Sequence, residues 1–251
     1  MVIDYTGKVA VVTGGSGGLG SVVVRKLLES GATVAMLGTK AEKVKAVEEK
    51  LSALGKVKGY VFNLEETEKI PELVTQIRED LGEIDTLFQC AALMGVGKIL
   101  TPENWDRCMA INAKSFYFMM KAVVEQSMQY KNNGTILNIS SMAGVRGMCP
   151  PMCNPIYSAT KGAVVALTKQ AAVQWGCYGV RANCIAPGAI ALDDTGDVPH
   201  KKTELGNYVP LGRDATQSDI ANFALYLNSD LNMAQTGTVT IVDGGAHVVG
   251  Y

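Results

Sequence analysis

The segment KVAVVTGGSGGLG at residues 8–20 decides the fold class of this chain. Residues 8–13 form a short, mostly apolar run of the kind found in a strand that is buried on both faces of a parallel sheet. Five glycines follow by residue 20, and residues 21–30 then show apolar positions at helical spacing before Gly31. Tight turns also collect glycine. Between a strand and a helix, however, such a turn lets backbone N–H groups approach a pyrophosphate without obstruction, so we predict nucleotide binding.

The rest of the chain continues the alternation of strands and helices. Further strands are expected at residues 32–37, 58–62, 84–90, 135–139, 180–185 and 238–242. Between them, helices are expected at about residues 39–54, 73–81, 103–130, 154–178 and 216–227. Residues 189–209 are poorly periodic and predict a long substrate loop. Without a repeat or a linker, residues 1–251 are expected to form a single α/β domain around a doubly wound parallel sheet.

Composition and charge exclude several classes of function. The chain has 251 residues, of which 47% are apolar and 19% charged, enough for a sizeable core. Its net charge of −1 and lack of a basic block give no electrostatic support for a nucleic-acid or membrane partner. No signal-peptide pattern and no long apolar run is present, so a soluble, cytoplasmic protein with a small-molecule substrate is expected.

The six cysteines predict no metal site. They are scattered at positions 90, 108, 149, 153, 177 and 184, which suits a reducing compartment. Cys149 and Cys153 are spaced C-x3-C with no histidine nearby, whereas zinc sites need four nitrogen or sulfur ligands at tighter spacing. We interpret these thiols as small apolar residues.

Tyr157 and Lys161 form a candidate acid/base pair. Asn154 and Pro155 are typical of the N-cap and first position of a helix, which places Tyr157 and Lys161 one turn apart on one face. An ammonium near a phenol lowers the tyrosine pKa from about 10 toward working pH, which would make Tyr157 a general acid/base. The alternative for the pair taken alone is a packed ring beside a solvated amine.

The end of the second strand bears on the choice of nucleotide. In dinucleotide-binding folds an acid at this point binds the ribose 2′-hydroxyl, and here the position is Gly38. Thr39 and Lys40 follow, and their hydroxyl and amine suit a 2′-phosphate, so NADP(H) is favoured over NAD(H). Alternatively, Thr39 and Glu42 form a capping box and Lys40 is a solvated residue of the first helical turn.

Five features occur in an order typical of one family: TGGSGGLG at residues 13–20, Asn112, Ser141, Tyr157-x-x-x-Lys161 and Pro187-Gly188. The chain therefore resembles the short-chain dehydrogenase/reductase family over essentially its whole length. The resemblance implies a Rossmann-type sheet with the strand order 3-2-1-4-5-6-7. It also implies a homotetramer whose interface includes the two long helices that carry Asn112 and Tyr157.

The resemblance also implies a role for each residue of the candidate catalytic set. Tyr157 would exchange a proton with the substrate oxygen, and Ser141 would hydrogen-bond that oxygen. Lys161 would hold the nicotinamide ribose and depress the tyrosine pKa, and Asn112 would hold a water in a proton relay. Two alternatives stay open: Ser140 in place of Ser141, because successive strand residues face opposite ways, and a hydrogen-bonded core amide for Asn112.

For the cofactor, the resemblance implies a turn of Gly14, Gly18 and Gly20 around the pyrophosphate. Asn63 stands where the family usually has an adenine-contacting Asp, and Ile190 would reach the nicotinamide amide through its backbone. The full set expected to bind cofactor, in addition to Tyr157 and Lys161, is Gly14, Ser16, Gly18, Leu19, Gly20, Thr39, Lys40, Asn63, Leu64, Cys90, Ala91, Pro187, Gly188 and Ile190.

The chain departs from the family pattern in several places. Residues 89–92 are Gln-Cys-Ala-Ala where Asn-Asn-Ala-Gly is usual, and Leu192 replaces a common Thr. Gly17 stands where many NADP-dependent relatives carry a basic residue. The interval from Ser141 to Tyr157 is longer than common and holds extra Met and Pro residues, which would lie over the substrate.

The function expected is NADP(H)-dependent interconversion of a secondary alcohol and a ketone. The two loop segments at residues 143–156 and 189–209 are rich in Met, Val and Leu, which favours an apolar, alicyclic or steroid-like substrate. One alternative is a β-ketoacyl carrier-protein reductase, for which the only candidate basic surface is Arg146, Lys201, Lys202 and Arg213. Another is a nucleotide-binding member without turnover, although the Ser, Tyr and Lys set is intact.

Overall fold

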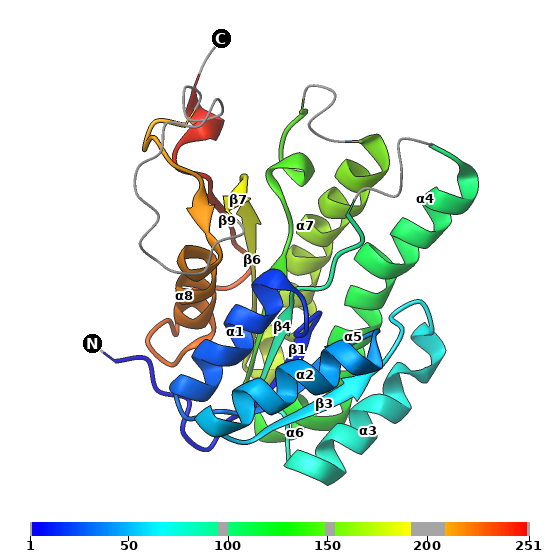
Figure 1. The fold of residues 1–251 in the computed structure, drawn as a ribbon, viewed down its shortest axis with the longest axis vertical. Coiled ribbons are helices and arrows are strands. Elements are labelled where there is room, and N and C mark those ends of the chain that lie inside the picture. The colour runs from blue at the N-terminus through cyan, green and yellow to red at the C-terminus, as the bar shows by residue number, and fades with distance from the viewer. Residues whose placement is uncertain (1, 95–99, 149–153, 192–208, 250–251) are drawn as a thin grey trace.

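The computed structural model describes residues 2–94, 100–148, 154–191 and 209–249. In this part of the chain, seven parallel strands form one sheet in the order β3-β2-β1-β4-β5-β6-β9 (Figure 1). The strands are β1 (Val9–Thr13), β2 (Thr33–Gly38), β3 (Val57–Val61), β4 (Thr86–Gln89), β5 (Gly134–Ile139), β6 (Val180–Pro187) and β9 (Val239–Val242). The predicted α/β class and strand order are confirmed, and the chain order reverses between β1 and β4.

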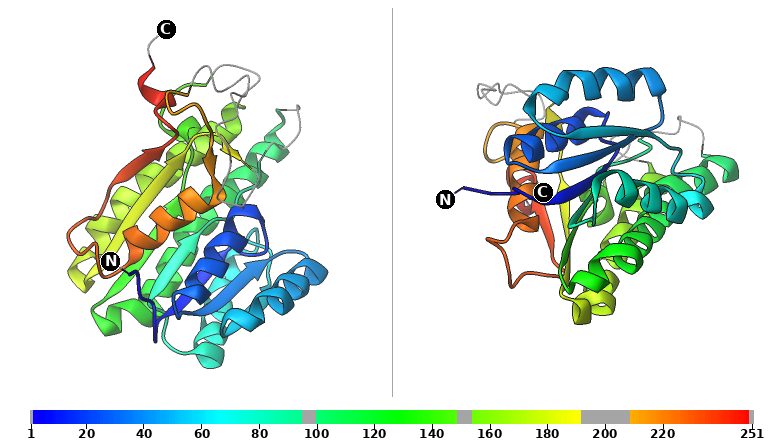
Figure 2. Two further views of the ribbon diagram at one scale, coloured as in Figure 1. Left: turned by 60° about the vertical axis from the view of Figure 1, so that its left-hand side comes forward. Right: turned by 90° about the horizontal axis from the view of Figure 1, so that it is seen from below.

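Helices cover both faces of the sheet (Figure 2). One face carries α1 (Gly18–Glu29), α2 (Ala41–Leu51) and α8 (Gln217–Asn228). The other carries α3 (Ile70–Leu81), α4 (Pro102–Met109), α5 (Ser115–Val123), α6 (Gln129–Lys131) and α7 (Pro155–Trp175). Side chains along each strand alternate between two cores: Ala10 and Val12 face α1 and α8, whereas Val11 faces α3 and α5. No helix in the described ranges is both long and apolar enough to cross a membrane.

The long helix predicted from residue 103 is present but not uniform. It runs from Pro102 to Lys131 and contains two π-helical segments, Ala110–Lys114 and Val124–Met128. Each π-helical turn adds a residue to the α-helical repeat and rotates the following side chains, a feature frequent at functional sites. The first of these segments carries Asn112.

The helix cap expected at Asn154 is confirmed. The Asn154 Oδ1 atom accepts from the Tyr157 backbone N–H at 2.8 Å, and Thr216 forms a reciprocal capping box with Asp219. The capping box expected at Thr39 is wrong, because the chain stays extended through Lys40 and α2 begins only at Ala41. Thr39 thus lies one residue before the N-cap, and no side chain caps α2.

Two other boundaries differ from expectation. Helix α1 begins at Gly18, three residues earlier than predicted, because the last glycines of the turn adopt helical geometry. The first residues of the predicted substrate loop form a short strand, β7 (Ile190–Ala191), which pairs in parallel with β8 (Ala215–Thr216). Residues 192–208, with Leu192, lie outside the described residues, as do Cys149 and Cys153.

Candidate active site

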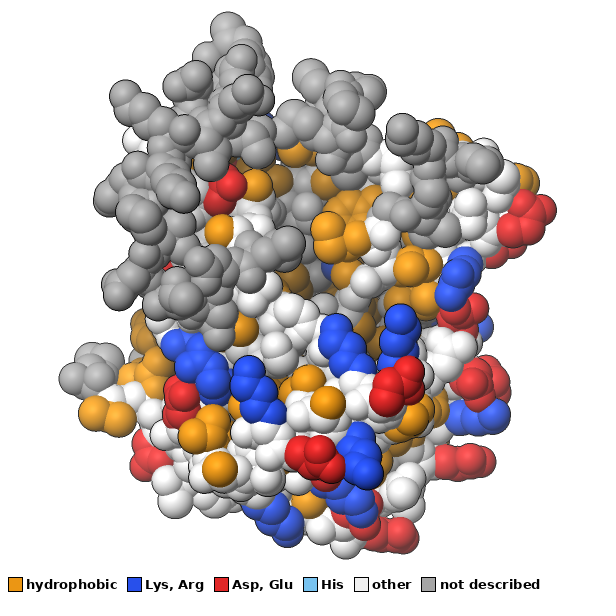
Figure 3. Space-filling model, viewed as in Figure 1, with side chains coloured by type: hydrophobic (Ala, Val, Ile, Leu, Met, Phe, Trp, Pro, Cys, Tyr) orange, Lys and Arg blue, Asp and Glu red, His pale blue; other side chains and the backbone are white. Residues whose placement is uncertain are grey.

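The candidate site lies at the carboxyl ends of β1, β4 and β5. In an open parallel sheet, ligands bind where the strand order reverses, here between β1 and β4. Figure 3 shows a hollow on this part of the surface, with hydrophobic side chains on the described part of its rim. The predicted glycine turn and the Ser, Tyr and Lys residues meet at this edge.

The glycine turn after β1 fits a pyrophosphate. Gly14 has a positive φ of 67°, and a Cβ there would lie 2.8 Å from the Ala91 Cα. A Cβ on Gly20 would overlap the Gly14 carbonyl. Helix α1 begins inside this turn, and it has neither a side-chain cap nor an acidic residue in its first turn. The N–H groups of the first helical turn and the positive end of the helix dipole therefore favour an anion.

The end of β2 disfavours an acidic side chain by packing. A Cβ on Gly38 would overlap the Ser16 hydroxyl and would lie 2.8 Å from the Val44 Cγ2 atom. Ser16 is itself buried, so it has little freedom to move aside. Thr39 and Lys40, by contrast, are exposed next to this point. An acid at this position would thus require Ser16 and Val44 to shift, and with glycine here the site lacks the carboxylate that binds the ribose hydroxyl in many dinucleotide folds.

The residues expected to contact the adenosine half of the cofactor, after β3 and β4, differ in which groups they can offer to a ligand. Asn63 is exposed after β3, and its Oδ1 atom accepts from the Glu65 backbone N–H at 3.1 Å. The Leu64 side chain packs into the core, which leaves only its backbone for a ligand. Burial raises the pKa of the Cys90 thiol to about 12, so that side chain is neutral. The Ala91 N–H donates to Thr13 Oγ1 at 3.3 Å, which ties the end of β4 to β1.

Ser140 and Ser141 at the end of β5 have different environments. The Ser140 hydroxyl is buried and donates to the Lys161 backbone carbonyl at 2.8 Å. Ser141 is half-buried, and its hydroxyl accepts from the Ala143 N–H at 3.2 Å at the start of a short helical turn, Met142–Gly144. Of the two serines, Ser141 is therefore the one whose hydroxyl can reach a substrate.

Lys161 is buried and lies close to Tyr157. The lysine is 1% exposed, and its Nζ atom donates to the Ile139 carbonyl at 2.8 Å. The same atom lies 5.7 Å from the centroid of the Tyr157 ring and 5.4 Å from that of Phe116. Burial lowers the pKa of Lys161 to about 8. The alternative interpretation of a solvated amine is wrong, because the ammonium is removed from water.

The Asn112 side chain binds protein groups on two sides. Its Oδ1 atom accepts from the Leu93 N–H at 2.7 Å, and its Nδ2 atom donates to the Leu93 carbonyl at 3.0 Å and to Thr160 Oγ1 at 3.3 Å. These bonds use both amide donors and leave one lone pair on Oδ1. The side chain therefore has the partners of a hydrogen-bonded core amide, and it joins the segment after β4 to α7. The water-holding role that the resemblance implies stays a prediction.

The segment after β6 borders the same edge. Gly188 donates its N–H to the Val242 carbonyl at 3.0 Å, and a Cβ there would lie 2.7 Å from the Asp243 Cβ. Ile190 is held by its pairing with Ala215 in the small sheet. Pro187, Gly188 and Ile190 are therefore fixed in place beside the glycine turn and Ser141.

Two residues next to this set were missed from the sequence. Phe116 forms part of the apolar surroundings of the Lys161 ammonium, and Gly144 admits α7 so closely that a Cβ would overlap the Lys161 backbone. Neither residue stands out locally, since one is an apolar helix residue and the other a loop glycine. Their roles depend on contacts between distant segments.

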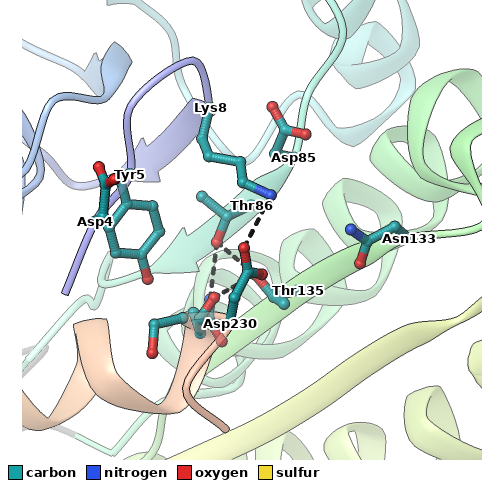
Figure 4. A pocket seen from close by; sticks show the side chains of 10 residues that line it. Asp4, Tyr5, Lys8, Asp85, Thr86, Asn133, Thr135 and Asp230 are labelled. Atoms are coloured by element: carbon teal, nitrogen blue, oxygen red, sulfur yellow. Dashed lines mark hydrogen bonds and ion pairs between the residues drawn. The ribbon is translucent and has the colours of Figure 1, made fainter. Parts of the chain in front are cut away.

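A small pocket lies at the opposite, amino-terminal edge of the sheet (Figure 4). It has a volume of about 10 Å³, room for a single water, and is lined by Asp4, Lys8, Asp85 and Asp230 among others. Lys8 and Asp230 form an ion pair there at 3.4 Å. None of the candidate site residues lines this pocket.

Comparisons with known proteins agree with this geometry. A family model described as enoyl-(acyl carrier protein) reductase matches residues 14–247. The chain is 34% identical to a 3alpha-hydroxysteroid dehydrogenase of Mediterraneibacter gnavus, over 98% of this chain and 99% of that protein. It is 31% identical to a 3-oxoacyl-(acyl-carrier-protein) reductase of Thermotoga maritima, over 95% and 97%.

Among solved structures, a levodione reductase superposes with a TM-score of 0.86 at 27% identity and covers 98% of this chain and 100% of its own. The family match, the full-length relatives and the arrangement of glycine turn, serine, tyrosine and lysine lead to one conclusion. The chain belongs to the short-chain dehydrogenase/reductase family and is an NAD(P)-dependent oxidoreductase.

Proposed function

We propose that this enzyme interconverts a secondary alcohol and a ketone with NADP(H), and that its substrate is apolar and alicyclic or steroid-like. The observation that carries the proposal is the position of the buried Lys161 ammonium, which lies 5.7 Å from the centroid of the Tyr157 ring and donates to the carbonyl of Ile139, two residues before Ser141. A hydroxyl donor, a phenol and a fixed cation next to a nucleotide site suit proton exchange at a carbonyl oxygen.

Each residue of this set has a distinct task in ketone reduction. The Tyr157 phenol gives its proton to the carbonyl oxygen while Ser141 hydrogen-bonds that oxygen, and the Lys161 cation stabilises the phenolate that forms. Gly14, Gly18 and Gly20 would hold the pyrophosphate of the cofactor, which supplies the hydride when bound. Asn112 positions α7 through Thr160, so we regard it as a positioning residue.

The test is Tyr157→Phe, assayed by NADPH absorbance on a panel of cyclic ketones. We expect kcat to fall by about 10²- to 10⁴-fold, because the phenylalanine ring still packs but has no hydroxyl group to donate a proton. Dinucleotide affinity, measured by calorimetry, should stay close to that of the wild type. As a control, Tyr130→Phe changes an exposed tyrosine distant from the site and should leave kcat unchanged. Near-normal kcat in Tyr157→Phe would contradict the mechanism.

The burial of Lys161 is costly, which supports a functional role. The difference between its pKa of about 8 and the ordinary 10.5 corresponds to about 3 kcal/mol against folding at neutral pH. Among the described residues no carboxylate pairs with this ammonium. A buried cation without a counter-ion is retained when its charge is needed, since an apolar residue would be more stable there.

We therefore expect Lys161→Met to stabilise the fold while it abolishes turnover. At pH 7 the free energy of unfolding should rise by roughly 1 to 3 kcal/mol, because the cost of the buried charge is removed. Since the unfolded chain binds more protons than the folded chain between pH 8 and 10.5, the wild type should gain stability in that window and approach the variant. Urea unfolding at pH 7 and pH 10 measures both effects. A less stable variant at pH 7 would show that the ammonium contributes to packing.

Apolar side chains around the site favour an apolar substrate. Met94, Leu100, Val145 and Leu211 are large, exposed and hydrophobic, and they stand on the segments that border the carboxyl edge of the sheet. Exposed apolar groups that gather around a hollow are typical of a ligand-binding surface (Figure 3). The hydroxysteroid dehydrogenase and levodione reductase among the relatives support a cyclic ketone or alcohol.

The relative named as a carrier-protein reductase keeps a second substrate class open. Such a substrate needs a basic docking surface, and Arg213 already forms an ion pair with Asp219 at 2.6 Å. Arg146 is half-buried, and Lys201 and Lys202 lie outside the described residues. Of these four basic residues, the two that the structure describes are paired or half-buried, which favours the apolar substrate. A higher kcat/KM on a β-ketoacyl thioester than on cyclic ketones in the same panel would reverse this choice.

Preference for NADP(H) rests on the end of β2. Packing against Ser16 disfavours an acid at Gly38, so no carboxylate repels a 2′-phosphate. The Thr39 hydroxyl is not used as a helix cap, and the Lys40 amine is exposed beside it. A charge-assisted hydrogen bond contributes about 1.5 to 3 kcal/mol, so these contacts support roughly a 10- to 1000-fold preference.

The measurement is kcat/KM with NADPH and with NADH on one substrate. Lys40→Ala should lower the ratio about tenfold or more, because one charged contact to the 2′-phosphate is lost. Lys43→Ala removes an equally exposed amine one turn further along α2 and should leave the ratio unchanged. Equal values for the two cofactors in the wild type, or an unchanged ratio in Lys40→Ala, would mean that Lys40 is only a solvated residue.

The outer face of α7 supports the proposal of a homotetramer. Ala159, Gly162, Ala166 and Val173 recur at helical spacing on the side of α7 that faces away from the core, and Val173 is 79% exposed. Trp105 on α4 and Phe118 on α5 are also partly exposed. Small residues allow helices to approach closely, so we expect a second copy to pack against this side of α7.

Light scattering at micromolar concentration should give about four times the 26.6 kDa chain mass. Val173→Arg should shift the mass to a smaller species, because a charge would be buried in the interface. Leu54→Arg, an exposed apolar residue beyond α2, is the matched control and should leave the mass unchanged. A monomeric wild type would overturn the proposal.

A further inference from the structure

Gln217 reaches the glycine turn from a distant part of the chain. It is the first residue of α8, which packs along α1 on the same face of the sheet (Figure 1). Its Nε2 atom lies 2.7 Å from the point that a Cβ on Gly18 would occupy, and its Cδ lies 3.7 Å from that point. The amide therefore rests against the first residue of α1, and a Cβ at that position would displace it.

The amide of Gln217 makes no side-chain hydrogen bond in the described part of the chain, although the residue is only 7% exposed. In the described part of the chain, two buried side-chain atoms have neither solvent contact nor a hydrogen-bond partner: Arg146 Nε and Asn228 Oδ1. The amide atoms of Gln217 are not in this group. What remains accessible of Gln217 thus includes its amide. A nearly buried amide that keeps its polar end open and unpaired is suited to accept a ligand.

The start of α8 fixes the backbone that carries this amide. The capping box of Thr216 and Asp219 fixes the first turn, and Arg213 pairs with Asp219 at 2.6 Å. The backbone segment before Gln217 is further fixed by the pairing of Ala215 with Ile190. Little conformational entropy is therefore lost when the side chain binds a ligand.

We propose that Gln217 donates from its Nε2 atom to a pyrophosphate oxygen of the dinucleotide, as a cofactor-binding residue supplied by α8. The uncapped N-terminus of α1 and the glycine turn already favour an anion beside Gly18, and a neutral amide donor adds one directed hydrogen bond. This inference rests on the proposed dinucleotide-dependent function.

The experiment compares Gln217→Met and Gln217→Glu with the wild type by calorimetric titration of NADP(H) and NAD(H). In Gln217→Met the side chain keeps about the same length but loses its N–H donor. The Kd of the dinucleotide that the wild type binds should therefore rise about 3- to 10-fold. Glu places a negative charge beside the pyrophosphate, so the Kd should rise more than about tenfold at low salt and less at high salt. Asn222→Asp, an exposed position on α8, makes the same charge change and should have no such effect.

A ligand without the pyrophosphate distinguishes a direct contact from general damage. Adenosine 2′-phosphate, or adenosine if NAD(H) is the cofactor, should bind the wild type and both Gln217 variants equally. Dinucleotide affinities within twofold of the wild type in both variants would overturn the inference, and so would an equal loss for the ligand without pyrophosphate. A wild-type protein that binds neither dinucleotide would overturn the proposed function itself, and the inference with it.

Discussion

The close contact between β5 and α7 is the constraint on which the candidate site depends. Ser140 donates its hydroxyl to the Lys161 carbonyl, and the Lys161 ammonium donates to the carbonyl of Ile139 at the end of β5. Gly144 allows the two backbones to meet without a side chain between them. These contacts fix the positions of Ser141 and Tyr157 relative to each other, although the two residues belong to different elements. A displacement of about 1 Å here would separate two groups that act on one oxygen atom in the proposed mechanism.

Close backbone packing also shapes the nucleotide side of the site. Gly14 and Gly20 fold the turn so tightly that no Cβ fits, and this leaves the N–H groups at the start of α1 accessible. At the end of β2 the same kind of packing, Ser16 against Gly38, decides which side chains can be present. The choice of nucleotide that we propose for this site therefore depends on close packing as much as on the charged side chains nearby.

The buried lysine shows how function and stability oppose each other in this fold. Its ammonium is surrounded by Phe116, Tyr157 and a backbone carbonyl, an environment that lowers its pKa and costs folding free energy. The same low-dielectric surroundings strengthen the effect of its charge on the neighbouring phenol. Two apolar cores on the faces of a seven-stranded sheet supply the stability that offsets this cost.

Local periodicity, caps and spacing in the amino-acid sequence indicated the alternation of strands and helices and the parallel sheet, and the resemblance to a family pointed to Ser141, Tyr157 and Lys161. The sequence also identified the glycine turn, which is contiguous. Only the tertiary structure decided that Ser140 binds α7 while Ser141 remains available, that Asn112 holds Leu93, and that Gln217 lies against Gly18. It also removed the expected cap at Thr39. These outcomes depend on distances between segments far apart in the chain, set when the sheet brings the ends of its strands together, and no local pattern encodes those distances.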